Sequence, residues 1–337
     1  MDLYVTFVGT AASVPSAARG TSATLIARGG ERWLVDCGEG TQRQLLRSGL
    51  GLVDLDLILL THLHGDHYLG LPGLLKTYGL RGRERPLRVG GPRGLVRLVD
   101  RLRAVFGRTA FPLELAEWDP GVVWETAGAR IEAFPTDHTV ASLGYVLVED
   151  DRPGAFDVAA AQARGVPPGP LYGRLQRGEE VIVEGRVVRP AEVLGPARPG
   201  RRVVVAGDTR PCRATVEAAR GASLLVHEAT FTEEERERAH ETGHSTAAQA
   251  GTVAREAGVD LLALTHLSTR CHPREIRREA EREFPRVVVP RDFDQVEIPF
   301  RERGEPRVRS VRERREATAE EGVESSAERA TVPGDDL

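Results

Sequence analysis

Three histidines and an aspartate lie within six consecutive positions of the stretch LLTHLHGDHYLG at residues 59–70. They are His62, His64, Asp66 and His67, and an apolar run directly precedes them. A core strand would not contain such groups, because a buried imidazole or carboxylate without a partner costs free energy. Neutral imidazole and carboxylate groups together are ligands for zinc and neighbouring divalent metals. The stretch therefore predicts a metal centre.

Polar side chains also follow several other apolar runs along the chain. They are His138 after IEAFPTD, Asp208 after VVVAG, His227 and Glu228 after LLV, and His266 after LLALT. One histidine after a strand is weak support for a ligand, but the repetition is informative. Since strand ends at one edge of a sheet lie close together, we expect these groups to join the first cluster.

The spacing predicts two ions rather than one. His62 and His64, two positions apart on an extended loop, point the same way and can bind one ion. Asp66 and His67 lie one step further and are better placed for a second ion. The predicted ligands are His62, His64 and His138 for the first ion, Asp66, His67 and His266 for the second, and Asp208 between both. Two ions roughly 3.5–4 Å apart lower the pKa of a shared water and stabilise both oxygens of a displacement. This pattern indicates a two-metal hydrolytic site.

The apolar patterning indicates the elements that position these groups. Strands are predicted at residues 3–10, 55–62, 87–91, 129–138 and 143–149, a hairpin at 24–38 turning at Gly29-Gly30, and helices at 40–50, 70–80 and 94–107. Further along, strands at 201–209, 223–230 and 259–268 alternate with helices at 211–222, 245–258 and 273–284. Such alternation is typical of sheets with helices packed outside them.

Residues 150–200 interrupt this pattern with a segment dense in proline and glycine. We expect one short helix at 157–165, a rigid turn at 167–170 and a strand at 179–188. The segment contains few large apolar residues. We therefore expect it to project from the core as an excursion that could not fold alone. An ordinary surface loop is the alternative, although loops longer than roughly 12–15 residues are uncommon and often functional.

Bulk properties exclude several classes of protein. No apolar stretch approaches the roughly 20 residues that span a bilayer, and the N-terminus lacks a secretory signal. Cys37, Cys212 and Cys271 are odd in number and contain no CxxC pair, which predicts a reducing cytoplasm rather than a disulfide framework. The net charge of −4 is matched by the −4 that we count from residue 310 onwards (four arginines, eight acidic residues). This charged tail, 310–337, is predicted to be disordered.

The motif HxHxDH with distant His, Asp and His resembles the metallo-β-lactamase superfamily. Further segments are similar to the ribonuclease Z family, which trims the 3′ trailer of precursor tRNA, and the match runs from Leu3 to about Phe300. These segments are FVGTAASVPSAARGTSA, VDCGEGTQRQL, DHTVASLGY, GDTRP, HEAT, GHSTA and LTHLSTR.

The resemblance implies an α/β fold, the αββα sandwich of that superfamily, with a protruding arm. It implies a catalytic domain at 1–309 whose flexible tRNA-binding arm is the excursion at about 151–199. The implied activity is a zinc-dependent endoribonuclease that leaves a 3′-hydroxyl through attack of a metal-activated water. Two Zn²⁺ per subunit are implied, with another divalent ion such as Mn²⁺ left open. The implied partners are precursor tRNA and a second copy in a homodimer, without a membrane.

The same resemblance implies roles for individual residues. Asp66 would also act as general base, and His244, oriented by Glu228, would protonate the leaving 3′ oxygen. The alternative for His244 is a neighbour of a helix N-cap, with Ser245 capping. Candidate substrate contacts are Ser268, Thr269 and Arg270 beside the ligand His266, and Arg174 and Arg177 in the arm. These arginines could equally be ordinary surface charge.

Two other functions compete with RNA cleavage. The first is hydrolysis of a small ester, sulfate ester, lactone or thioester on the same scaffold, which fold and ligands cannot exclude. The arm and GHSTA favour RNA, since a small substrate needs no contact far from the metals. The second is a metal-stabilised RNA-binding or scaffolding protein without activity. The complete ligand set and the separate His244 argue against it.

Overall fold

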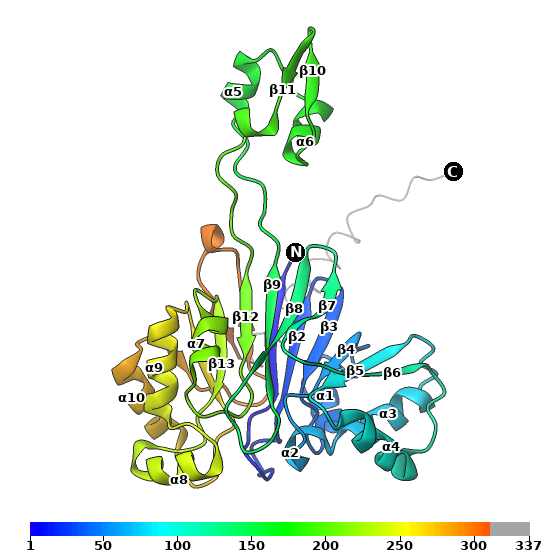
Figure 1. Cartoon of the computed structure of the whole chain (residues 1–337), viewed down its shortest axis with the longest axis vertical. Helices are drawn as coiled ribbons and strands as arrows, with labels where there is room; N and C mark the ends of the chain where they lie inside the picture. Colours follow the sequence, from blue (N-terminus) through cyan, green and yellow to red (C-terminus); the bar gives the residue numbers. More distant parts are fainter. Residues whose placement is uncertain (311–337) are drawn as a thin grey trace, which may run out of the picture.

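The computed structural model describes residues 1–310 of the chain. Within this range, two large sheets pack face to face with helices on their outer sides (Figure 1). The first sheet has the order β17 (Arg307–Arg309), β16 (Gln295–Glu297), β1 (Leu3–Gly9), β2 (Ala23–Arg28), β3 (Glu31–Val35), β4 (Leu57–Leu59), β5 (Leu87–Gly91), β6 (Leu113–Glu117). The second has the order β15 (Val287–Val288), β14 (Leu262–Thr265), β13 (Leu224–Glu228), β12 (Arg202–Val205), β9 (Leu143–Glu149), β8 (Ala129–Pro135), β7 (Gly121–Thr126).

Helices cover the outer face of each sheet. The first sheet packs against α1 (Thr41–Arg47), α3 (Leu71–Leu80) and α4 (Leu95–Phe106), and the second against α7 (Arg213–Ala219), α9 (Ala247–Ala257) and α10 (Pro273–Glu283). The short helices α2 (Gly65–Tyr68) and α8 (Arg236–Thr242) lie at one end of the sandwich (Figure 1). This arrangement confirms the predicted αββα sandwich.

Burial on both faces explains the continuous apolar runs of the strands. In β4, Leu57 and Leu59 belong to the cluster between the sheets, whereas Ile58 belongs to the cluster under the helices. Successive side chains of a strand point to opposite faces, so a strand covered on both sides is apolar at every position. The predicted hairpin also forms, with Arg28 paired to Glu31 across the turn. No helix among residues 1–310 is long and apolar enough to cross a membrane.

Strand direction places the polar strand ends at one edge. β12, β13 and β14 are parallel, and β8 runs in the same direction because it is antiparallel to β9, which is antiparallel to β12. Their carboxyl ends therefore meet at the end of the sandwich where α2 and α8 lie. At the other end of the sandwich, β9 ends and β12 begins, and the chain between these two strands forms the arm (Figure 1).

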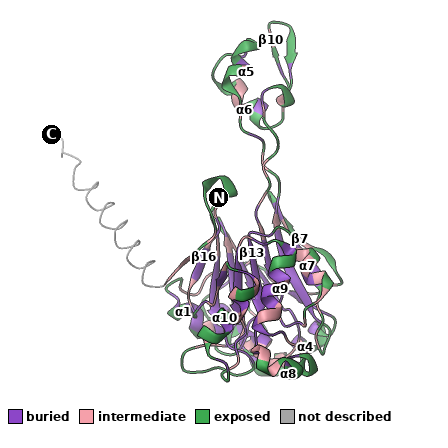
Figure 2. Cartoon of the chain, turned by 90° about the vertical axis from the view of Figure 1, so that its left-hand side faces the viewer, coloured by how far each residue is buried: buried purple, intermediate pink, exposed green. Residues whose placement is uncertain are grey.

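The excursion forms a small separate unit at the end of two extended connections (Figures 1 and 2). It contains α5 (Val158–Ala163), α6 (Pro170–Gln176), β10 (Val181–Val183) and β11 (Arg186–Val188). The prediction of one helix and one strand was wrong, because α6 begins at the proline of the expected turn and a hairpin replaces the strand. Ala161, Val166, Leu175, Val181 and Val188 form a buried apolar cluster inside this unit. We call the unit the arm.

Arginines and an aromatic ring hold the root of the arm. The guanidinium carbons of Arg152 and Arg201 lie 3.4 and 4.1 Å from the ring centre of Phe300. Arg152 donates two hydrogen bonds, of 2.7 and 3.0 Å, to Glu302. Arg201 donates to the buried Glu149 at the end of β9. Both connections are thus fixed to the sandwich where they leave it. The predicted tail lies outside the described residues apart from Ser310.

Candidate metal centre

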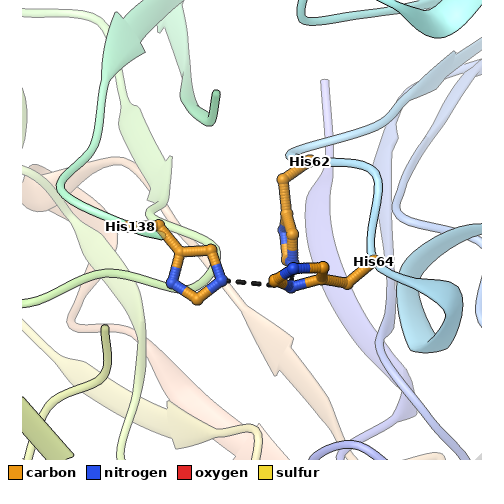
Figure 3. Close-up of side chains that lie close together, drawn as sticks. All are labelled: His62, His64 and His138. Atoms are coloured by element: carbon orange, nitrogen blue, oxygen red, sulfur yellow. Dashed lines mark hydrogen bonds between the residues drawn. The ribbon is translucent and has the colours of Figure 1, made fainter. Parts of the chain in front are cut away.

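The loop after β4 begins the site. His62 ends the buried run, His64 is the N-cap of α2, and Asp66 and His67 lie in that single-turn helix. His64 has extended backbone with φ −81° and ψ 150°, so this loop turns the four side chains inward. Figure 3 shows His62 and His64 meeting His138, which comes from the loop after β8.

The first three histidines fit a single ion. His62 Nε2 lies 3.0 Å from His64 Nδ1, and His138 Nε2 lies 3.2 Å from the same atom. Tetrahedral zinc with bonds of about 2.0–2.1 Å places two nitrogens about 3.3 Å apart. His138 Nδ1 donates a hydrogen bond to the carbonyl oxygen of Gly243 at 2.8 Å. The lone pair of the other ring nitrogen, Nε2, can therefore bind an ion. The ligand atoms of these histidines therefore converge as a metal site requires.

The remaining predicted ligands lie against the first group. His67 Nε2 is 3.5 Å from Asp66 Oδ2 and 3.4 Å from Asp208 Oδ2. His266 Nε2 is 3.2 Å from each of the same two oxygens. Buried His67 Nε2 has no hydrogen-bond partner among the described residues, as expected for a nitrogen whose partner is an ion. All seven predicted ligands thus belong to groups whose ligand atoms lie within 4.8 Å of one another.

Burial and charge set the protonation of the cluster. Burial, with help from His67, lowers the pKa of His62 to about 2, so this imidazole is neutral as a ligand must be. Burial alone would raise the pKa of Asp208, but His266 and His67 lower it well below its usual range. Burial also opposes ionisation of Asp66, but the hydrogen bond with His266 and the nearby His67 imidazole lower its pKa. Both carboxylates are therefore ionised.

Asp36 supports the cluster and was missed as a functional residue. Its Oδ2 accepts a 2.8 Å hydrogen bond from His67 Nδ1, and its Oδ1 accepts from Thr61 N at 2.8 Å. This contact fixes the tautomer of His67 and directs Nε2 to the site. Asp36 follows the apolar residues WLV, so its position after a strand was the available signal.

Two of these residues have strained backbones. Asp36 and His266 adopt positive φ values of 60° and 55°. Such conformations of non-glycine residues cost about 1–3 kcal/mol each and cluster at functional sites. The surrounding hydrogen bonds must therefore offset this cost.

We expect Asp36→Asn to lower metal affinity by about 10- to 100-fold, because an amide cannot orient His67 as the carboxylate does. Competition with a chromophoric chelator measures this. Asp56→Asn is the matched control, since Asp56 is also a carboxylate next to a strand but precedes β4 and pairs with Arg85 at the surface. Equal affinities of the two variants would contradict a role for Asp36.

A second polar pair lies beside the predicted ligands. His244 Nδ1 donates to Glu228 Oε1 at 2.8 Å, and the His244 ring lies 5.2 Å from that of His138 and 5.3 Å from that of His266. Burial alone would lower the pKa of His244, but the Glu228 carboxylate outweighs it and raises the pKa to about 9. His244 is therefore protonated at neutral pH.

Glu228 connects this pair to a predicted ligand. Thr230 Oγ1 donates to Glu228 Oε2 at 2.6 Å and lies 2.9 Å from His266 Nδ1. One carboxylate thus orients both His244 and His266. The alternative for His244 assumed that Ser245 caps the next helix, and this was wrong. Thr246 is the N-cap of α9, and Ser245 donates a hydrogen bond to the carbonyl oxygen of Thr209.

The candidate substrate residues lie at two distant places. Ser268, Thr269 and Arg270 follow His266 at the site end of the sandwich, and exposed Arg270 forms a 3.0 Å ion pair with Glu235. Arg174 and Arg177 lie in the arm, where both pair with Glu179 at 2.9 and 3.1 Å. The fold therefore does not bring these two sets together within one chain.

Known proteins resemble the chain over most of its length. The model of the metallo-beta-lactamase superfamily matches residues 17–266. Ribonuclease Z of Gemmatimonas aurantiaca is 46% identical, covering 90% of this chain and 98% of its own length. Ribonuclease Z of Myxococcus xanthus is 47% identical, with 89% and 99% covered. The crystal structure of human tRNase Z, short form, is 29% identical with a TM-score of 0.64, and 88% and 99% of the two chains are covered.

The range that the family model matches contains strands of both sheets, so the likeness is not confined to one motif. The chain belongs to the metallo-β-lactamase superfamily and, within it, to the ribonuclease Z family.

Proposed function

We propose that this protein is a metal-dependent endoribonuclease that removes the 3′ trailer from precursor tRNA and leaves a 3′-hydroxyl. The observation that carries this is a convergent set of metal ligands with a separate His–Glu pair beside it, in a chain whose curated relatives are ribonuclease Z. Membership of the superfamily implies a divalent metal. We propose two Zn²⁺ per subunit, with His62, His64 and His138 holding one, Asp66, His67 and His266 the other, and Asp208 both.

Each protein group has a defined task in this proposal. Divalent ions bound here would lower the pKa of water and neutralise charge on a phosphodiester. Asp66 is ionised and faces the ligand cluster, so it can accept the proton of the attacking water. His244 holds a proton at neutral pH and can donate it to the 3′ oxygen as the bond to phosphorus breaks. Ser268, Thr269 and Arg270 lie beside His266 and can hold the phosphate.

The Glu228 contact gives a testable pH dependence. Activity that needs protonated His244 is present below its pKa and is lost as the pH rises through it. Glu228→Gln removes the charge that raises this pKa from its ordinary value to about 9. We therefore expect the alkaline limb of the kcat profile to move to lower pH in this variant. An unmoved limb would contradict the assignment of His244 as the acid.

The arm and the site lie at opposite ends of the sandwich, which supports a homodimer. β9 runs from the end of the sandwich that holds the predicted ligands to the root of the arm (Figure 1). An arm that extends away from its own site is suited to hold tRNA for the site of a second copy. Arg174 and Arg177 are proposed to contact the tRNA backbone, where positive charge positions the substrate.

Deleting residues 155–195 tests the arm. The backbones of Gly154 and Pro196 lie side by side, so the chain can close without disturbing the sandwich. We expect the KM for precursor tRNA to rise about tenfold or more, since phosphate contacts supply much of RNA affinity. Hydrolysis of bis(p-nitrophenyl) phosphate, which is too small to reach the arm, should persist. Equal loss of both activities would contradict the tethering role.

The decisive test of the function is cleavage of a labelled precursor tRNA carrying a 3′ trailer, with and without chelator. A single chelator-sensitive cut just after the discriminator base is expected. If the protein leaves precursor intact yet hydrolyses small esters, the small-ester alternative is the better description. We place the activity in the cytoplasm, and the three free cysteines are consistent with a reducing compartment.

A further inference from the structure

A cavity of about 280 Å³ lies beside the loop that contacts the metal cluster. We call it the Phe293 cavity. Three segments far apart in the sequence form its walls: the loop before β2, helix α1 and the turn before β16. Its lining residues are Pro15 to Gly20, Glu39, Gly40, Arg43, Gln44, Arg47, Asp292 and Phe293.

The buried Asp292 holds these walls together. Its Oδ1 accepts from Thr10 Oγ1 at 2.7 Å, and its Oδ2 accepts from Gly20 N and from Gln44 Nε2, both at 2.6 Å. These contacts join the loop, α1 and the turn. The cavity is therefore a built feature of the fold rather than a gap between surface side chains.

An aromatic ring stands in this cavity at a conformational cost. Phe293 has φ 75°, a left-handed conformation that costs a bulky residue about 1–3 kcal/mol. A 2.6 Å hydrogen bond from Phe293 N to the carbonyl oxygen of Phe7 helps to hold it. The guanidinium carbon of Arg47 lies 5.5 Å from the ring centre. Asparagine or glycine would adopt this backbone more easily, so the packing of Phe293 alone does not explain its choice.

Positive charge lines the same cavity. Neither Arg43 nor Arg47 forms an ion pair with a carboxylate in the described range, and the side chain of Arg43 also forms no hydrogen bond there. Arg19 donates to Thr10 Oγ1 and to the carbonyl oxygen of Pro290. Two carboxylates also line the cavity: the exposed Glu39 and the buried Asp292, whose oxygens accept hydrogen bonds from Thr10, Gly20 and Gln44. Three arginines with one aromatic face are suited to a phosphate joined to a planar base.

The loop connects this cavity to the ligand cluster. Ser13 N donates a 2.8 Å hydrogen bond to Asp66 Oδ2, and Ser13 has a strained φ of 57°. Pro15, the first lining residue, is two positions further, which the chain spans in roughly 7 Å. The cavity therefore opens within about one nucleotide of the predicted ligands.

We infer that the Phe293 cavity binds one unpaired nucleotide next to the cleaved phosphodiester. The base stacks on the Phe293 ring, and Arg43 contacts a phosphate. This inference rests on the proposed endoribonuclease function and adds a subsite that selects single-stranded RNA at the cut, because a paired base cannot stack on a protein ring.

The stacking is tested with precursors that carry one abasic nucleotide at successive positions around the cut. In the wild-type protein, the abasic change at one position should raise KM by about 5- to 150-fold, the range for loss of a base–aromatic stack. Phe293→Asn removes the ring but suits the backbone, so it should raise KM similarly with intact precursor and be insensitive to the same abasic change. Phe293→Tyr should restore the sensitivity.

The phosphate contact is tested by salt. Arg43→Gln should reduce the slope of log KM against log salt concentration by roughly 0.7, as expected for one contact to a single strand. Arg101→Gln is the matched control, because Arg101 is also an exposed helical arginine without an ion pair among residues 1–310 but lies on α4, away from the cavity. The control should keep the wild-type slope.

The outcomes separate the subsite from the function. If the wild-type protein does not cut precursor tRNA, the proposed function fails. If it cuts, but the effects of Phe293→Asn and the abasic nucleotide simply add at every position, the stacking is overturned while the function stands. A slope for Arg43→Gln equal to that of Arg101→Gln overturns the phosphate contact.

Discussion

Asp208→Ala is expected to lose metal and activity together. The Asp208 Oδ2 atom lies 3.4 Å from His67 Nε2, 3.2 Å from His266 Nε2 and 3.8 Å from His62 Nε2. One buried oxygen therefore faces imidazoles of both proposed ion sites. Without its charge, five histidines would be left around any ions with only Asp66 to balance them. We expect activity to fall by at least about 10³-fold, more than removal of one electrostatic contact costs, to that of the chelated protein.

Metal content, measured by atomic emission after dialysis, accompanies the activity assay. Asp119→Ala is the matched control, because Asp119 is a surface aspartate that, in the part of the chain that the structure describes, pairs with Arg93 alone. The control should retain wild-type metal and turnover. Retention of two ions by Asp208→Ala would show that the assignment of Asp208 to both ions is wrong.

His244→Ala is expected to lower kcat for precursor tRNA by about 10²- to 10⁴-fold, the usual contribution of a general acid, with metal content kept. The ribose 3′ oxygen is a poor leaving group unless it receives a proton. His244, held by Glu228, is the group proposed to donate this proton. In contrast, p-nitrophenolate leaves without protonation. The same variant should therefore hydrolyse bis(p-nitrophenyl) phosphate with a much smaller loss.

This difference between leaving groups distinguishes an acid from a structural residue. His240→Ala is the matched control, since His240 is an exposed histidine at the end of α8, four positions before His244. It should behave as the wild-type protein with both substrates. Equal losses of RNA cleavage and ester hydrolysis in His244→Ala would contradict its role as the proton donor.

Some features of this protein follow from the sequence alone. Each predicted ligand stands after an apolar run, and strand polarity brings such positions to one edge of a sheet. For this reason His62, His138, Asp208 and His266 could be assigned together although up to 204 positions separate them (266 − 62). The alternation of sheet strands with outer helices also follows, because buried strands and amphipathic helices have distinct periods. The αββα layering itself was implied by the family resemblance.

The arm shows where local patterns are insufficient. PPGP at residues 167–170 has the composition of a turn, yet Pro170 is the first residue of α6, a position that proline also favours. The stretch at 179–188 forms a hairpin because Glu184 and Gly185 both adopt positive φ. A few residues of mixed composition are compatible with either structure, so packing around the arm's own apolar cluster decides between them.

Contacts between distant segments were decided only by the tertiary structure. Asp36 orients His67, and Thr230 joins His266 to Glu228. In the wall of the Phe293 cavity, Asp292 accepts a hydrogen bond from Gln44, which lies 248 positions earlier in the chain. A sequence determines which groups must be buried or exposed, because that depends on each segment's own pattern. It does not show which buried partner completes a hydrogen bond, because that geometry exists only once the two sheets and their loops have packed.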